Sequence, residues 1–308
     1  MNEQTLIFGP ENHLVGTVTL PTEVKAGHTR TMALLTNAGV IPRIGPHRLN
    51  VRLARRFAEM GIATLRFDMS GLGDSRRSGS RRPTGDQFVV DTRSAMDLAQ
   101  SKFGCDQFFM VGFCSGGDVA HLVALEDARL RAIVMWDSYV YPTRKAKLRG
   151  FIHRLRRHTL ASAAQKVAQR LAAPRKRPEA SSDSQAPEGP SIFGRTRMPA
   201  RDDFGQRIRT LVDRGVEVLF LYSGGEPEWY NYHDQFRDMF STYGFVDRVG
   251  YEYIVRNDHT FIQPHAQAAL IESVERWLNQ RALPALSRER AEPTETTTVA
   301  PAPVLSAA

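Results

Sequence analysis

The chain has 308 residues, of which 42% are hydrophobic and 24% charged, with a formal net charge of +8 at pH 7. Such values are ordinary for a globular protein and allow one large domain with an insertion. The sequence lacks a run of about 18 apolar residues and its N-terminus lacks the features of a signal peptide, so we expect neither a spanning helix nor a secretory leader. We therefore expect a cytoplasmic protein, with peripheral attachment to a membrane left open.

The sequence contains two cysteines, Cys105 and Cys114. They lie nine residues apart, and the second follows an apolar run of strand length. An extended segment at about 3.3 Å per residue would hold them beyond disulfide reach. We expect no disulfide, which fits a reducing compartment.

Short apolar runs bounded by turn residues predict eight strands along the chain. The first two form an antiparallel hairpin at a sheet edge, and runs with helical spacing separate most of the later ones. This alternation predicts an α/β fold with a mainly parallel sheet covered by helices on both faces. The expected strands cover residues 5–8, 14–20, 32–36, 63–67, 108–111, 132–136, 216–222 and 251–255.

The spacing of these elements also predicts the domain organisation. The segment between residues 137 and 216 is far longer than a normal crossover, and from residue 283 onward Pro, Thr, Ala, Ser and Glu dominate. We predict a core in two parts with an inserted lid between them and a disordered tail after them. The core covers residues 1–142 and 206–282, the lid 143–205 with a flexible loop at about 178–199, and the tail 283–308.

Residues 112–117 read Gly-Phe-Cys-Ser-Gly-Gly and lie between an apolar run and a run with helical spacing. A strand, a sharp turn with small neighbours and a helix make a nucleophile elbow. Gly112 and Gly116 flank Cys114 symmetrically, whereas a nucleophilic Ser115 would set Phe113 where a small residue is needed. We predict Cys114 as the nucleophile, since the positive end of a helix dipole favours its thiolate. The alternative is an inert buried thiol.

A nucleophilic cysteine needs a base, and an acid that orients the base. His259 follows the last expected strand and is the expected base, whereas His265 lies within a helical run. For the acid we expect Glu226, after the seventh strand, with Asp137 at the end of the sixth as the alternative. Glu228 and Asp234 are weaker candidates for the same role.

Catalysis at a carbonyl also needs donors for the developing oxyanion. One donor is expected to be the backbone N–H of Ser115, directly after the nucleophile. The second is expected from Gly39 or Val40, in the turn after the third strand. The remaining histidines show no metal-ligand spacing, so we predict no metal and no cofactor.

These motifs resemble those of a known superfamily. The Gly-x-Cys-x-Gly-Gly form is similar to the elbow of dienelactone hydrolases and polyhydroxyalkanoate synthases, and eight strands with the elbow after the fifth resemble the α/β-hydrolase order over residues 30–282. Residues 37–48 and 230–232 resemble a bacterial subgroup named exosortase-associated or serine-aminopeptidase-like hydrolases. The resemblance implies an α/β-hydrolase fold with a helical lid and a role near acyl or polysaccharide metabolism.

Residues 144–177 carry twelve Lys or Arg and no Asp or Glu. Apolar residues at helical spacing within them predict one or two basic amphipathic helices. Such helices can cover the substrate pocket, dock an acyl carrier protein or a coenzyme A thioester, or bind an anionic membrane surface. We expect no nucleic-acid binding, because aromatic residues do not interleave with the basic ones.

Together these features predict a hydrolase of carboxylic esters or thioesters that acts through an acyl-cysteine. One alternative is an acyltransferase, in which an alcohol or amine takes the acyl group from an acyl-thioester donor. A second alternative is a non-catalytic hydrolase scaffold that binds an anionic partner.

Overall fold

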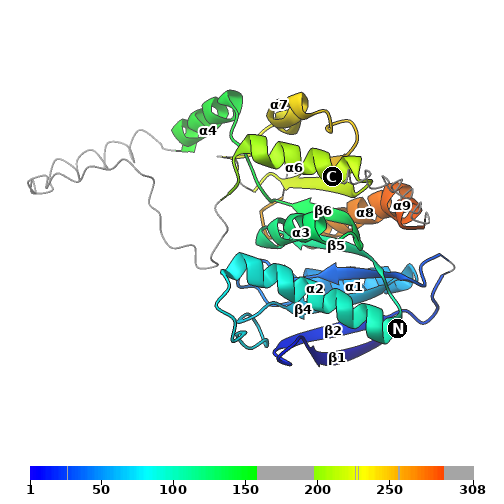
Figure 1. The fold of residues 1–308 in the computed structure, drawn as a ribbon. Coiled ribbons are helices and arrows are strands. Elements are labelled where there is room, and N and C mark those ends of the chain that lie inside the picture. Colours follow the sequence, from blue (N-terminus) through cyan, green and yellow to red (C-terminus); the bar gives the residue numbers. More distant parts are fainter. Residues whose placement is uncertain (26, 158–197, 226, 228, 256, 288–308) are drawn as a thin grey trace, which may run out of the picture.

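The structure is a computed structural model that describes residues 1–25, 27–157, 198–225, 227, 229–255 and 257–287 (Figure 1). Most of the predicted lid, including residues 178–197 of its loop, lies outside these residues. So do Glu226, Glu228 and residues 288–308. None of the described helices is both long and apolar enough to cross a membrane.

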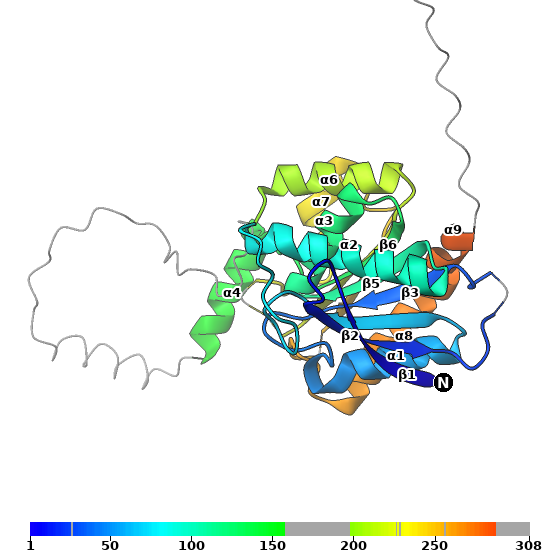
Figure 2. The same cartoon turned by 60° about the horizontal axis from the view of Figure 1, so that its bottom comes forward.

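One sheet of eight strands, in the order β1-β2-β4-β3-β5-β6-β7-β8, forms the centre of the molecule. The β1–β2 hairpin lies at one edge and pairs antiparallel with β4, while all other neighbours are parallel. Figure 2 views the molecule from the side of this hairpin. The predicted strands and the mainly parallel sheet are confirmed. The strands are β1 (Asn2–Phe8), β2 (Leu14–Leu20), β3 (Thr31–Leu35), β4 (Ala63–Asp68), β5 (Gln107–Phe113), β6 (Leu130–Trp136), β7 (Glu217–Ser223) and β8 (Gly250–Ile254).

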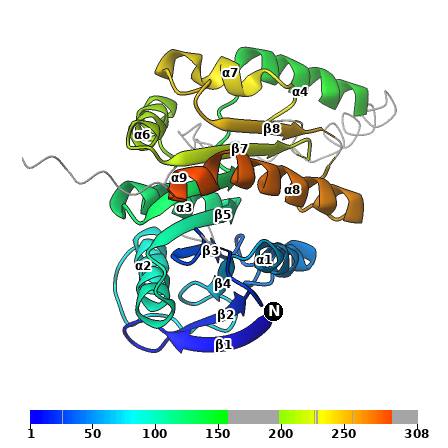
Figure 3. The same cartoon turned by 90° about the vertical axis from the view of Figure 1, so that its right-hand side faces the viewer.

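Helices cover both faces of the sheet, and in Figure 3 α2, α3 and α6 lie on one side of the strands and α1 and α8 on the other. Two hydrophobic cores result, one with α2, α3, α6 and α7 and one with α1, α8 and α9. The central strands are buried on both faces, which explains why they appear as continuous apolar runs in the sequence. The helices are α1 (Leu49–Glu59), α2 (Thr84–Phe103), α3 (Ser115–Glu126), α4 (Arg144–Arg157), α6 (Arg201–Asp213), α7 (Gln235–Phe240), α8 (Pro264–Trp277) and α9 (Leu283–Ser287).

Two predicted boundaries differ from the structure. Helix α6 begins inside the predicted lid at Arg201, and its Phe204 is fully buried, so this segment belongs to the core. The tail was expected to be disordered from residue 283, but Leu283 and Leu286 are buried in α9 against the second core. The overall polar composition of residues 283–308 indicated disorder. However, Leu283 and Leu286 are three residues apart, so they lie on one face of a helix and can be buried together.

Candidate active site

Cys114 stands alone between the last residue of β5 and the first residue of α3, with φ 52° and ψ −118°. A non-glycine residue rarely adopts this conformation, and such strain gathers at functional sites. The Cys114 N–H donates to the Trp136 carbonyl (2.8 Å), and the Cys114 carbonyl accepts from the Gly117 N–H (3.0 Å). The turn between β5 and α3 thus has one residue with positive φ at its centre, and this residue is Cys114 rather than Ser115.

The glycines around the elbow are required by close backbone contacts. A Cβ on Gly112 would lie 2.4 Å from the backbone of Gly116, and a Cβ on Gly116 would lie 2.9 Å from the Asn37 carbonyl oxygen. A Cβ on Gly117 would lie 2.8 Å from the Cβ of Ser138. The small-x-Cys-x-small spacing therefore reflects the tight packing of β5 against the start of α3.

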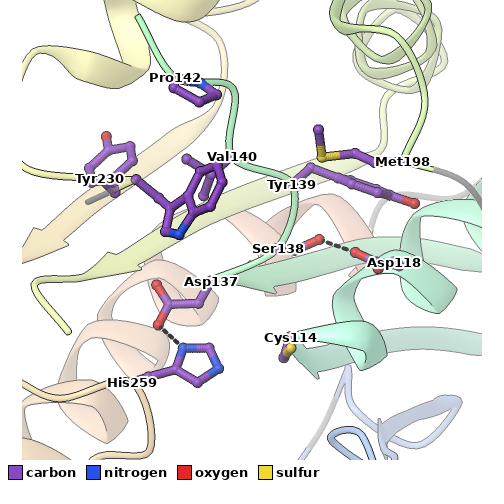
Figure 4. A pocket seen from close by; sticks show the side chains of 11 residues that line it. Cys114, Asp118, Asp137, Ser138, Tyr139, Val140, Pro142, Met198, Tyr230 and His259 are labelled. Atoms are coloured by element: carbon purple, nitrogen blue, oxygen red, sulfur yellow. Dashed lines mark hydrogen bonds and ion pairs between the residues drawn. The ribbon is translucent and has the colours of Figure 1, made fainter. Parts of the chain in front are cut away.

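His259 and Asp137 face each other across the ends of two strands. His259 Nδ1 lies 2.9 Å from Asp137 Oδ2, and the imidazole lies between Asp137 and Cys114 (Figure 4). Asp137 directly follows β6, and His259 follows β8. The structure thus pairs His259 with the alternative acid of the sequence analysis. The first choice, Glu226, lies outside the described residues.

The Asp137 carboxylate is fixed by a residue that the sequence did not single out. Ser223, the last residue of β7, donates to it through its backbone N–H (2.7 Å) and its hydroxyl (2.6 Å). The carboxylate side chain is only 8% exposed. No motif marks Ser223, because its role depends on where β7 ends relative to β6.

The two glycines that follow Ser223 allow the β7 and β8 loops to meet. A Cβ on Gly224 would lie 1.9 Å from the Val255 carbonyl oxygen, and one on Gly225 would lie 2.2 Å from the backbone nitrogen of His259. In the structure the pair lets the backbone that carries His259 approach closely.

The electrostatics around His259 favour its protonated form. Burial lowers the pKa of His259, but its interactions with Asp137 and Cys114 outweigh this and raise the pKa to about 10. The ring also lies against Phe113, with 4.7 Å between ring centroids, which limits its orientation.

Two of the three expected oxyanion residues meet in the structure. The Gly39 N–H donates to Ser115 Oγ at 2.9 Å, so the turn after β3 is joined to the first residue of α3. Val40, the next residue of that turn, is 62% exposed. The buried Asn37 amide holds the turn, because it donates to the Ile41 carbonyl and to Asp68 and accepts from the Met69 N–H.

A pocket of about 380 Å³ opens beside Cys114 and His259. Most of its lining is apolar or aromatic, and Met198 and Trp229 are both about half exposed. One polar pair stands out, since the Ser138 hydroxyl donates to Asp118 at 2.6 Å (Figure 4). The other lining residues are Asp137, Tyr139, Val140, Pro142 and Tyr230. A concave, largely apolar site with a few polar groups is typical of small-molecule pockets.

No group of three or more His, Cys, Asp or Glu that could hold a metal ion occurs among the described residues. The groups that the described residues bring together at the site are the Cys114 thiol, the His259 imidazole and the Asp137 carboxylate.

Comparison with known proteins agrees with this fold. A family model described as serine aminopeptidase, S33 matches residues 47–188, a range that includes Cys114 and Asp137. No curated protein matches the chain.

Several solved structures share the fold. An esterase from Pyrococcus furiosus is 13% identical with a TM-score of 0.56, and the match covers 91% of each chain. An esterase domain from Rhodothermus marinus is 15% identical with a TM-score of 0.53, over 91% of this chain and 99% of that one. An α/β serine hydrolase homologue from Coxiella burnetii is 13% identical with a TM-score of 0.52, and the match covers 90% of this chain and 97% of that one. At these identities the likeness is one of fold.

Proposed function

We propose that this chain, which has the α/β-hydrolase fold, hydrolyses carboxylic esters or thioesters through an acyl-cysteine intermediate. The observation that carries the proposal is the alignment of Cys114, His259 and Asp137 beside a pocket that is mostly apolar. An elbow cysteine with a histidine and a buried carboxylate has the parts that nucleophilic catalysis requires.

In the first half of the reaction, the Cys114 thiolate attacks the carbonyl carbon and forms a C–S bond, and the carbonyl electron pair moves to oxygen. Collapse of this intermediate breaks the bond to the leaving group. The protonated His259 gives its proton to the departing oxygen or sulfur and becomes neutral. The raised pKa of His259 suits this role, since the imidazole holds its proton until the leaving group takes it.

In the second half, neutral His259 removes a proton from water, and the resulting hydroxide attacks the acyl-cysteine. The C–S bond then breaks, which releases the carboxylic acid and restores the thiolate and the imidazolium. Asp137 orients the ring through Nδ1 in both halves of the reaction. One substrate and one water give one acid and one alcohol or thiol.

The oxyanion is stabilised by Ser115 in two ways in this proposal. Its backbone N–H is the first donor, directly after the nucleophile. The Gly39 N–H donates to the oxygen of the Ser115 hydroxyl, and this hydroxyl can in turn donate its own proton to the oxyanion. Accepting the first hydrogen bond polarises the Ser115 O–H and strengthens the second. Gly39 then supports the oxyanion through Ser115.

Acyl transfer is a second candidate function because α4 offers a cationic surface near the pocket. Lys145 and Arg149 of this helix lie over the Tyr232 ring, 4.3 and 5.4 Å from its centroid. Arg149 and His153 also line a second cavity of about 530 Å³. This cationic surface suits an anionic thioester, such as an acyl coenzyme A or an acyl carrier protein, or an anionic membrane. An acceptor alcohol or amine would then replace water.

The first test is alkylation of the native protein by iodoacetamide, read by peptide mass spectrometry. Cys105 is an internal control, because burial raises its pKa to about 11 and leaves it only 4% exposed. We expect Cys114 to be alkylated much faster than Cys105, and the rate at Cys114 to fall in His259→Ala. Equal rates at the two cysteines would contradict an activated Cys114. Modification of Ser115 by a fluorophosphonate would contradict the assignment of the nucleophile.

Turnover then separates the candidate functions. With a panel of esters and thioesters, hydrolysis predicts free acid at a rate that added alcohols or amines do not change. Acyl transfer predicts a new ester or amide and faster turnover when the right acceptor is present. A reactive Cys114 without turnover of any of these compounds would favour the non-catalytic scaffold.

A further inference from the structure

A third cavity, of about 260 Å³, lies between the loop that follows β4 and the first turn of α2. It shares no lining residue with the pocket at Cys114. We call it the arginine pocket. Its lining contains two arginines, four hydroxyl side chains and no Asp or Glu, namely Ser70, Gly71, Leu72, Arg77, Ser78, Ser80, Arg82, Thr84, Gln87 and Phe88.

Positive charge in the arginine pocket has two sources. Arg77 and Arg82 are exposed, and neither makes an ion pair within the described part of the chain. Both the backbone N–H and the guanidinium of Arg82 donate to Ser80 Oγ, at 3.1 and 3.2 Å, which holds this arginine beside the cavity. The second source is α2, whose first residue, Thr84, lines the cavity and whose N-terminus has no side-chain cap. The N–H groups of its first turn can therefore bind an anion.

Gln87 carries a buried hydrogen-bond acceptor that the described residues do not satisfy. It is only 7% exposed, and its Nε2 donates to Asp91 Oδ1 at 2.7 Å, which fixes the orientation of the amide. Its Oε1 is buried and has no hydrogen-bond partner among the described residues. An unmet buried acceptor is costly, so a ligand that donates a hydrogen bond here would be favoured.

The base of the arginine pocket is rigid. Asp91 is fully buried and accepts from the Ser70 N–H (2.7 Å), the Ser70 hydroxyl (2.9 Å) and Gln87. Glu11 accepts from the Ser78 hydroxyl and the Gly79 N–H, and Asp86, in the first turn of α2, does not line the cavity. Asp91 and Glu11 are therefore met by donors other than Arg77 and Arg82, and these two guanidinium groups remain available to an incoming anion.

We propose that the arginine pocket binds a small phosphomonoester that also carries a hydroxyl group. Its phosphate oxygens accept from Arg77, Arg82 and the first turn of α2, since a guanidinium matches phosphate with two parallel hydrogen bonds. Its hydroxyl donates to Gln87 Oε1. A cavity of about 260 Å³ has room for a phosphate and a few carbon atoms, given roughly 30 Å³ per water-sized group. This site is separate from the proposed catalysis.

The test is calorimetric titration of the full chain with glycerol 3-phosphate, inorganic phosphate and glycerol. We expect both anions to bind, glycerol 3-phosphate more tightly than phosphate, and glycerol not to bind over the same concentrations. The double variant Arg77→Ala/Arg82→Ala should weaken both anions roughly ten-fold. Gln87→Met should remove the preference for glycerol 3-phosphate and leave phosphate binding unchanged.

A matched control is Arg144→Ala/Lys147→Ala, which removes two cations from α4. This variant should bind both anions like the wild type, and thermal unfolding should show that every variant is folded. The proposal is overturned if neither anion binds at millimolar concentration. It is also overturned if only the α4 variant loses binding, because the anion site is then on α4. Since the readout is binding, the result does not depend on whether Cys114 turns over an ester.

Discussion

At the scale of single residues, the function proposed here depends on how His259 is held. Its Nδ1 faces the buried Asp137, which Ser223 fixes with two hydrogen bonds. Its ring lies against Phe113, the neighbour of Cys114. These contacts leave the imidazole one orientation, in which it lies next to the sulfur.

Asp137→Asn should therefore be severely impaired. The substitution keeps the size of the side chain but removes the charge that helps raise the pKa of His259. We expect kcat/KM to fall by roughly 10²–10⁴ and the pKa of His259, followed by NMR, to fall as well. Glu226→Gln is the control, since Glu226 was the acid first expected from the sequence. A larger loss in Glu226→Gln than in Asp137→Asn would contradict the assignment of Asp137.

Ser115 tests the proposed oxyanion site. If its hydroxyl relays the polarisation of the Gly39 N–H, Ser115→Ala should lower kcat by about 10²–10³ with little change in KM, and Ser115→Thr should recover most of it. Alkylation of Cys114 by iodoacetamide forms no oxyanion and should stay at the wild-type rate. An unchanged or higher kcat in Ser115→Ala would mean that the hydroxyl only occupies the Gly39 N–H.

At the scale of elements, turns at the ends of parallel strands build the site. The elbow follows β5, Asp137 follows β6, the Ser223–Gly225 turn ends β7, and the His259 loop follows β8. Because these strands are parallel neighbours, their carboxyl ends meet at one edge of the sheet. The short helix α9 lies in the core that α1 and α8 form on one face.

Helix α9 should contribute to stability despite its composition. Leu286 is 1% exposed, so Leu286→Ala should lower the free energy of unfolding by about 2–5 kcal/mol. Leu148→Ala is the matched control, since Leu148 is 61% exposed and should cost much less. Urea unfolding of the two variants measures both values. Equal small losses would show that α9 does not pack as the structure has it.

At the scale of the whole molecule, the raised pKa of His259 links stability to pH. In the unfolded chain this pKa is near 6.5, and in the folded protein it is about 10. Folding therefore favours the protonated ring, and the stabilisation is complete below about pH 6.5 and is lost as pH rises toward 10. We expect the stability difference between wild type and His259→Gln to shrink over this window. A difference that is constant or grows with pH would contradict the shift.

Much of the fold and part of the site could be predicted from the sequence because their signals are local. Apolar runs identified the eight strands, and the continuous apolar character of the central ones follows from their burial on both faces. The glycines around Cys114 predicted a tight turn between a strand and a helix, and in the structure a Cβ at Gly112 would meet the backbone of the following helix. The position just after the last expected strand likewise predicted His259 as the base.

Only the tertiary structure decided how distant segments meet. Asp137 comes directly after β6 in the sequence and Glu226 comes three residues after β7, so sequence position alone could not rank them. The contact with His259 Nδ1 depends on where β6 and β7 end and on the turn that Ser223 makes. The arginine pocket likewise requires the loop after β4 to fold against the first turn of α2, which places two arginines and the unpaired oxygen of Gln87 around one cavity. The sequence determines which elements form because periodicity and small residues act over a few positions. The partners of a buried polar group are decided by packing between elements far apart in the chain.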